Sequence, residues 1–201
     1  MKKEALVVFG GVFNPPLNSH FLIAEQIKNQ FVEVEKIIFV PTNKLYGKQD
    51  LVDNTHRYNM LKLVINKNPK FMLSPIEIDS NRQPYTFETL EAISKEYTNK
   101  TIYYSMGTDN LKTFSTWKKP EEIIKNHKIL IFERDRDNME DIIANNEFLM
   151  QNKDAFIKIN QDIRTNHSST FVKNEIKAGN SIRYLTPDEI YEYIEQNKLY
   201  M

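Results

Sequence analysis

Two glycines and a histidine follow the first apolar run of the chain. Residues 5–9 read ALVVF, and GGVFNPPLNSH (10–20) comes directly after them. Gly10 and Gly11 have no Cβ, so the chain can turn sharply there and a phosphate can approach the backbone amides. His20 falls in the first turn of the helix predicted next, where free amides and the helix dipole stabilise an anion. This spacing indicates a phosphate site, although a tight strand-to-helix connection would use the same glycines.

A second group of polar side chains lies near the C-terminus. HSSTFVK (167–173) places three hydroxyl groups ahead of a cation, Lys173. Hydroxyls at the start of a helix, followed by a positive charge, suit phosphate binding through helix-end amides and charge. The alternative is that the hydroxyls only cap the helix. The chain contains neither a GxGxxG dinucleotide fingerprint nor the GK[ST] of a P-loop.

The elements that must position these residues alternate between apolar runs and amphipathic stretches. Continuous apolar strands are typical of a parallel sheet covered on both faces. Repeated strand–helix alternation predicts right-handed crossovers and a doubly wound, mostly parallel α/β sheet with helices on both faces. The predicted strands are 5–9, 36–41, 71–78, 101–107, 128–134 and 155–159. The predicted helices are 18–31, 55–65, 86–97, 120–125, 138–151 and one that begins at 186–189 and ends near 196.

We expect residues 1–201 to form one domain, with segment 165–201 packing as a helical extension. Ligands of such sheets bind beyond the carboxyl ends of the strands. The segments that follow predicted strands are therefore the candidate site: 10–20, 42–48, 79–86, 107–117 and 134–136.

Composition excludes several classes of protein. The 201 residues carry 27 basic and 27 acidic side chains, a formal net charge of zero, and no cysteine. Disulfides, thiolate metal sites and cysteine nucleophiles are excluded. The balanced charge argues against a nucleic-acid or membrane-surface binder, and the histidines lack metal-ligand spacing. With no signal peptide and no apolar run near the ~20 residues of a membrane span, we expect a cytoplasmic protein; no oligomeric state follows from the sequence.

Six segments, in order and spacing, carry a resemblance to one enzyme family. They are GGVFNPPLNSH (10–20), HRYNMLKLVI (56–65), RQPYTFETL (82–90), MGTDNLKTFSTW (106–117), HSSTFVK (167–173) and GNSIRYLTPDEIYEYIEQNKLY (179–200). Together they resemble the motifs of the bacterial nicotinate mononucleotide adenylyltransferases, within the nucleotidyltransferase superfamily, over nearly the whole chain. The resemblance implies a Rossmann-like nucleotidyltransferase fold. It also implies adenylyl transfer from ATP to nicotinate mononucleotide, with Mg²⁺, giving deamido-NAD and pyrophosphate.

The resemblance assigns roles to individual residues. The catalytic residues it implies are His20, Lys48 and Lys173. The implied ATP contacts are Gly10, Gly11, Val12, Phe13, Arg134, Ser168, Ser169 and Thr170. The implied contacts to the pyridine nucleotide are Tyr85, Thr86, Gly107, Asp109 and Trp117. Plainer interpretations stay open: Trp117 as a core residue, Asp109 as a helix N-cap, and Arg134 as part of a solvated charge cluster. His56 and Arg57 are interpreted as structural.

The chain departs from the family pattern in the segment 10–17, called the phosphate loop below, and again near the C-terminus. The pattern has a histidine where this chain has Leu17, which cannot hydrogen-bond, and an arginine where it has Lys173. His167 replaces an apolar residue and could supply a compensating donor. Two alternatives therefore stay beside the expected enzyme. One is a nucleotidyltransferase with another phosphorylated acceptor, such as nicotinamide mononucleotide. The other is a catalytically impaired nucleotide-binding homologue.

Overall fold

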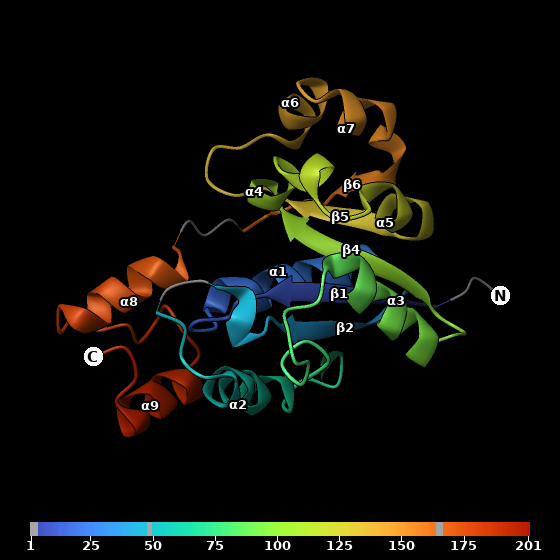
Figure 1. Ribbon diagram of the computed structural model, residues 1–201. Coiled ribbons are helices and arrows are strands. Elements are labelled where there is room, and N and C mark those ends of the chain that lie inside the picture. Colours follow the sequence, from blue (N-terminus) through green and yellow to red (C-terminus); the bar gives the residue numbers. More distant parts are fainter. Residues whose placement is uncertain (1–3, 48–49, 164–166) are drawn as a thin grey trace.

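Six parallel strands form a single sheet in the order β3-β2-β1-β4-β5-β6 (Figure 1). The structure is a computed structural model, and it describes residues 4–47, 50–163 and 167–201. The strands are β1 Ala5–Gly11, β2 Val34–Pro41, β3 Phe71–Leu73, β4 Thr101–Gly107, β5 Lys128–Phe132 and β6 Phe156–Lys158. Each pair of neighbours is parallel. The predicted doubly wound α/β fold is confirmed.

Helices cover both faces of this sheet. They are α1 Asn18–Gln30, α2 Asn54–Ile65, α3 Thr86–Glu96, α4 Thr108–Leu111, α5 Pro120–Asn126, α6 Met139–Ala144, α7 Glu147–Gln151, α8 Ser169–Lys177 and α9 Asp188–Asn197. Short 3-10 turns occupy Lys44–Tyr46, Phe114–Thr116 and Lys153–Ala155. Helix α9 packs on α2, and α8 lies beyond the end at which β1 and β4 finish (Figure 1). No helix in the described part of the chain is long and apolar enough to cross a membrane.

The two faces of β1 belong to two separate apolar cores, because successive strand residues point to opposite sides. Val7 and Phe9 join the core that contains buried residues of α1, α2 and α9. Leu6 and Val8 join the core that contains buried residues of α3 and α5. Burying each large apolar side chain contributes about 1.5–3 kcal/mol relative to leaving it exposed. Central placement of β1 holds its carboxyl end, where the glycines lie, in a rigid position.

Two predicted elements were wrong in extent. The strand predicted over 71–78 ends at Leu73, and the chain then turns, with the amide of Asp79 donating to the Pro75 carbonyl. Proline has no amide to donate to a ladder, and β3 is accordingly an edge strand. The helix predicted over 138–151 is two helices, α6 and α7. Asn146 begins the second of them, because its side chain accepts a hydrogen bond from the Leu149 amide.

Candidate nucleotide-binding site

One cavity of about 1150 Å³ lies across the carboxyl ends of the central strands. All five segments expected to contribute to a site supply lining residues, and α8 adds more. The sequence-predicted residues that line it are Gly10, Gly11, Val12, Phe13, His20, Tyr85, Thr86, Gly107, Asp109, Trp117, Arg134, Ser168, Ser169, Thr170 and Lys173. Lys48 lies outside the described residues. A cavity of this size can hold two joined nucleotides.

The phosphate loop turns at Phe13 and not at the glycines, which corrects the expectation from sequence. Gly10 and Gly11 are the last residues of β1, whereas Phe13 has a φ of 48°, in the left-handed region. Gly11 is needed for a different reason: a Cβ there would lie 2.9 Å from Cζ of Phe13. Beyond the strand, the amides of Val12 and Phe13 donate to no acceptor among the described residues. Two amides are thus available to an anion at the strand exit.

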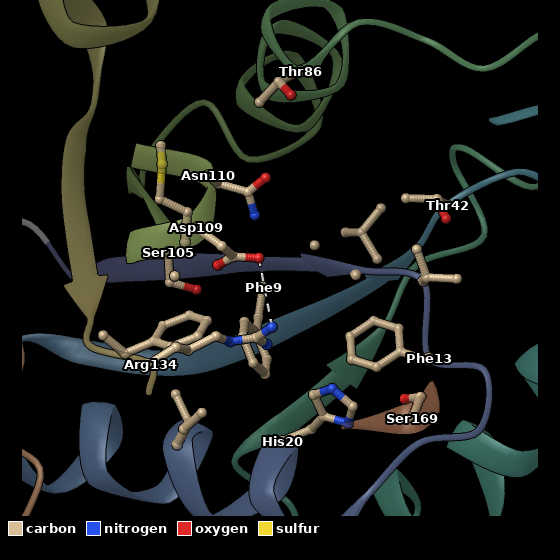
Figure 2. Close-up of a pocket in the computed structure, with 18 of the residues that line it drawn as sticks. Phe9, Phe13, His20, Thr42, Thr86, Ser105, Asp109, Asn110, Arg134 and Ser169 are labelled. Carbon is tan, nitrogen blue, oxygen red and sulfur yellow. Dashed lines mark ion pairs between the residues drawn. The ribbon is translucent and has the colours of Figure 1, made fainter. Parts of the chain in front are cut away.

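The His20 imidazole has a defined tautomer. The backbone amide of Leu17 donates to Nδ1 of His20 at 2.9 Å, so the ring proton of the neutral form is on Nε2. Burial, helped by the charges of Arg134 and His167, lowers the pKa of His20 to about 3. The ring packs edge-on against Phe13, with centroids 5.1 Å apart, and lies beside Ser169 (Figure 2). At neutral pH, His20 therefore presents a neutral N–H donor next to the loop.

Buried and half-buried polar side chains from α2 and from the C-terminal residues hydrogen-bond to the phosphate loop. Arg57, on α2, is 0 % exposed and donates to the Val12 carbonyl at 2.9 Å and the Val52 carbonyl at 3.2 Å. Asn14 accepts a hydrogen bond from the Tyr200 hydroxyl at 2.9 Å. The interpretation of Arg57 as structural fits these contacts, and they show that its target is the phosphate loop. Nothing in the sequence indicated the role of Tyr200, which is 186 positions from Asn14.

The start of α8 faces the same loop. Ser168 caps the helix, because its Oγ accepts from the Phe171 amide at 3.2 Å. The Ser169 hydroxyl donates to the Pro15 carbonyl at 2.9 Å and so ties α8 to the loop. Both hydroxyls are thus engaged in structure, while Thr170 and the half-buried Lys173 line the cavity. The capping interpretation of the serine cluster is confirmed for Ser168, and phosphate binding by these residues stays a prediction.

Asp109 and Arg134 face one another across the ends of β4 and β5 (Figure 2). Their closest charged atoms are 3.6 Å apart, and both side chains are largely exposed. Asp109 is not the N-cap of α4, because Gly107 occupies that position. Arg134 therefore has an ionic partner in the cavity wall, and the exposure of both side chains leaves its two interpretations open.

Gly107 is expected to be intolerant of alanine because of this pair. A Cβ at Gly107 would lie 2.3 Å from Oδ1 of Asp109, 3.0 Å from Phe132 and 3.1 Å from Nε of Arg134. Gly107→Ala should displace Asp109 and lower the kcat/KM of a reaction carried out in this cavity roughly 10- to 100-fold, the cost of misplacing a positioning group. Steady-state kinetics of a double-mutant cycle checks the cause. In an Asp109→Ala background the same glycine substitution should have a smaller effect, due only to the contacts with Phe132 and Arg134, and a full additional loss would rule out displacement of Asp109 as the main cause.

Trp117 and the start of α3 form the opposite end of the cavity. Trp117 is half-buried, packs on Phe114 with ring centroids 5.3 Å apart, and also lines the cavity. The core and ligand interpretations of Trp117 are thus compatible. Tyr85 is 54 % exposed and stacks with Phe87. The amides of Thr86 and Phe87, in the first turn of α3, donate to no acceptor among the described residues.

A buried polar network that sequence reasoning missed supports this end. Glu77 accepts from Nε2 of Gln83 at 2.7 Å and from the Thr89 hydroxyl at 2.8 Å, and burial raises its pKa. Asn43 donates to the carbonyls of Glu77 and Ser80, at 3.0 and 2.8 Å. The network connects the loops after β2 and β3 to α3. It therefore fixes where the first turn of α3 points.

The comparisons with known proteins agree with this geometry. The family model described as cytidylyltransferase-like matches residues 8–175. A probable nicotinate-nucleotide adenylyltransferase of Clostridium tetani is 33 % identical, with 100 % of both chains covered. The chain belongs to the nicotinate-nucleotide adenylyltransferase family. The nicotinate-nucleotide adenylyltransferase of Bacillus subtilis is 30 % identical over 100 % of this chain and 99 % of its own.

Solved structures support the same fold. The Plasmodium falciparum nicotinic acid mononucleotide adenylyltransferase complexed with NaAD superposes with a TM-score of 0.81 at 20 % identity, covering 98 % of this chain and 97 % of that one. The resemblance found in the sequence is thereby confirmed at the level of family and fold. Leu17, the position at which the resemblance predicts a histidine, is buried to 1 % exposure.

Proposed function

We propose that this chain transfers the adenylyl group of ATP to nicotinate mononucleotide, giving deamido-NAD and pyrophosphate in NAD biosynthesis. The observation that supports the proposal is one cavity bordered by two separate pairs of backbone amides with no acceptor among the described residues. One end has the amides after β1, His20 and the start of α8. The other has the start of α3 and Trp117. A triphosphate suits the first end, and a pyridine ring with its carboxylate suits the second.

The reaction requires alignment more than acid–base chemistry. A phosphate oxygen of nicotinate mononucleotide attacks the α-phosphorus of ATP. The new P–O bond forms as the bond from that phosphorus to the bridging oxygen breaks, and pyrophosphate leaves with the electron pair. The amides of Val12 and Phe13, Nε2–H of His20 and the ammonium of Lys173 would donate to phosphate oxygens as charge shifts. Arg134 and Asp109 would hold the nucleotides in line.

The residues present suit a Mg²⁺ ion that binds mainly through the phosphates of the nucleotide. Among the described residues, no three imidazole or carboxylate groups converge as a metal site. Phosphate and water oxygens would therefore be its main ligands, with Asp109 as one of the carboxylates that line the cavity. When bound, Mg²⁺ would neutralise charge on the triphosphate.

Pyrophosphate release tests the proposed function. ATP and Mg²⁺ are supplied with nicotinate mononucleotide or nicotinamide mononucleotide in separate reactions. Release with the first acceptor and little with the second is expected, because free amides at the start of α3 favour a carboxylate. Preference for the amide would indicate a different acceptor. ATP binding without release from either would identify an impaired homologue, which Leu17 makes a real alternative.

A further inference from the structure

Position 17 contributes nothing polar to the phosphate end of the cavity. Leu17 is the N-cap residue of α1, and its side chain belongs to the buried apolar core that includes Phe13 and Phe21. Its amide is used by Nδ1 of His20. The loop and α1 therefore present one imidazole to a phosphate, that of His20.

A second imidazole reaches this place from a distant part of the chain. His167 lines the same cavity, just before the start of α8. The hydrogen bond from the Ser169 hydroxyl to the Pro15 carbonyl, at 2.9 Å, holds this part of the chain against the phosphate loop. The charge of His167 also contributes to lowering the pKa of His20, in keeping with the two rings being close.

The His167 imidazole has an unused hydrogen-bonding atom. Its Nε2 is shielded from solvent and has no hydrogen-bond partner in the described structure. Leaving a buried polar atom unpaired costs about 1–3 kcal/mol, and native proteins seldom do so without a ligand to pair with it. Because Nε2 is shielded as the side chain lies, a ligand in the cavity would pair with it only if the ring turned on binding.

The surroundings favour an anion as the partner. Lys173, on α8, lines the cavity together with His167, which precedes this helix. Arg134 also lines the cavity, with Asp109 as its ionic partner. Val12 and Phe13, whose amides have no acceptor among the described residues, line the same cavity. The cavity lining thus supplies Lys173 and Arg134 as cations to the end that holds the two imidazoles, although the carboxylates of Glu133 and Asp135 line it as well.

We propose that His167 is a phosphate-binding residue, which supplies from the α8 side the imidazole donor that position 17 lacks. Its ligand is the polyphosphate chain of a nucleoside triphosphate. The inference rests on the proposed function for the identity of that nucleotide as ATP. It assigns a binding role to a residue that the family pattern leaves apolar.

Calorimetric titration of three ligands tests this role. Tripolyphosphate, ATP and adenosine are each titrated into the wild-type protein, His167→Ala and His167→Gln. A lost hydrogen bond to a charged group predicts that His167→Ala binds tripolyphosphate and ATP about 10-fold more weakly. Adenosine binding should not change. His167→Gln keeps an N–H donor near the position of Nε2 and should retain most of the affinity.

His127→Ala is the matched control. His127 is half-buried outside the cavity and hydrogen-bonds the Ile102 carbonyl at 3.0 Å. Its removal should leave tripolyphosphate binding as in the wild type. In parallel, the imidazole ¹H–¹³C resonance of His167, assigned by its loss in His167→Ala, should shift as tripolyphosphate is added, and that of His127 should not.

The outcomes separate this inference from the proposed function. The inference would be overturned if His167→Ala bound tripolyphosphate as tightly as the wild type. It would also be overturned if the His167 resonance of the wild type did not shift at saturation, whether or not the enzyme is active. A wild-type protein that binds tripolyphosphate through His167 but transfers no adenylyl group would support the inference and contradict the proposed function. Failure of the wild-type protein to bind tripolyphosphate would contradict both.

Discussion

Replacement of His20 by alanine is expected to slow adenylyl transfer about 100- to 1000-fold, the loss that follows removal of one preorganised donor to developing charge. Nε2 is the donor in question, because Nδ1 is occupied by the Leu17 amide at 2.9 Å. The effect should appear in kcat more than in KM, since the interaction strengthens as charge moves to the leaving pyrophosphate. Single-turnover kinetics with ATP and nicotinate mononucleotide measures it directly.

Two variants separate the catalytic use of His20 from its structural use. Asparagine places an acceptor where Nδ1 lies but does not reach the position of Nε2. His20→Asn should therefore fold with near-normal stability and be as slow as His20→Ala. Glutamine reaches the position of Nε2 but gives up the bond to the Leu17 amide. His20→Gln should retain part of the rate and lose stability. Equal rates in His20→Asn and the wild type would remove Nε2 from the reaction.

The pH dependence of the rate follows from the same contacts. Since the pKa of His20 is lowered from 6.5 to about 3, the ring stays neutral throughout the range where the enzyme would be assayed. The profile of rate against pH should therefore show no rise or fall near pH 6.5 caused by titration of His20. Because the neutral form is favoured by folding, its contribution to stability is present above pH 6.5 and is lost as the pH falls toward 3.

Replacement of Arg57 by methionine should give the largest loss of stability, about 3 kcal/mol in the free energy of unfolding. The methionine keeps much of the apolar stem but leaves the Val12 and Val52 carbonyls without their guanidinium donor, while Oδ1 of Asn54 keeps only the bond from the Lys44 amide. Arg57 is 0 % exposed, so water cannot easily replace the guanidinium. The remaining folded protein should also bind ATP less tightly, because the Val12 carbonyl no longer fixes the loop. Urea unfolding followed by circular dichroism measures the first effect.

Arg136→Met provides the control for this measurement. Arg136 is exposed, and such a surface change should alter the free energy of unfolding by no more than about 0.5 kcal/mol. The same unfolding midpoint in both variants would show that the contacts of Arg57 do not stabilise the loop. Arg57→Lys should be intermediate, since an ammonium cannot reproduce the planar fork that reaches several acceptors at once.

Local pattern explains why much of the fold was predictable. The continuous apolar run of β1 and the alternation of strands with amphipathic helices follow from burial on two faces, which is a property of neighbouring residues. The failures have local causes as well. Pro75 ended β3 earlier than its apolar neighbours suggested, and Asn146 began a new helix inside a stretch with helical spacing. Both residues are visible in the sequence as signals that end a strand or begin a helix. At these positions the hydrophobic periodicity predicts that the element continues.

The sequence by itself determined the doubly wound fold, the family, and the segments that meet at the carboxyl ends of the strands, because each depends on short-range spacing and order. Only the tertiary structure decided how the atoms of those segments are used. It showed that Nδ1 of His20 is occupied and that Ser168 caps α8. It also placed Arg57 and Tyr200 behind the phosphate loop. Such hydrogen bonds join residues up to 186 positions apart, and only the packed chain brings their donors and acceptors together.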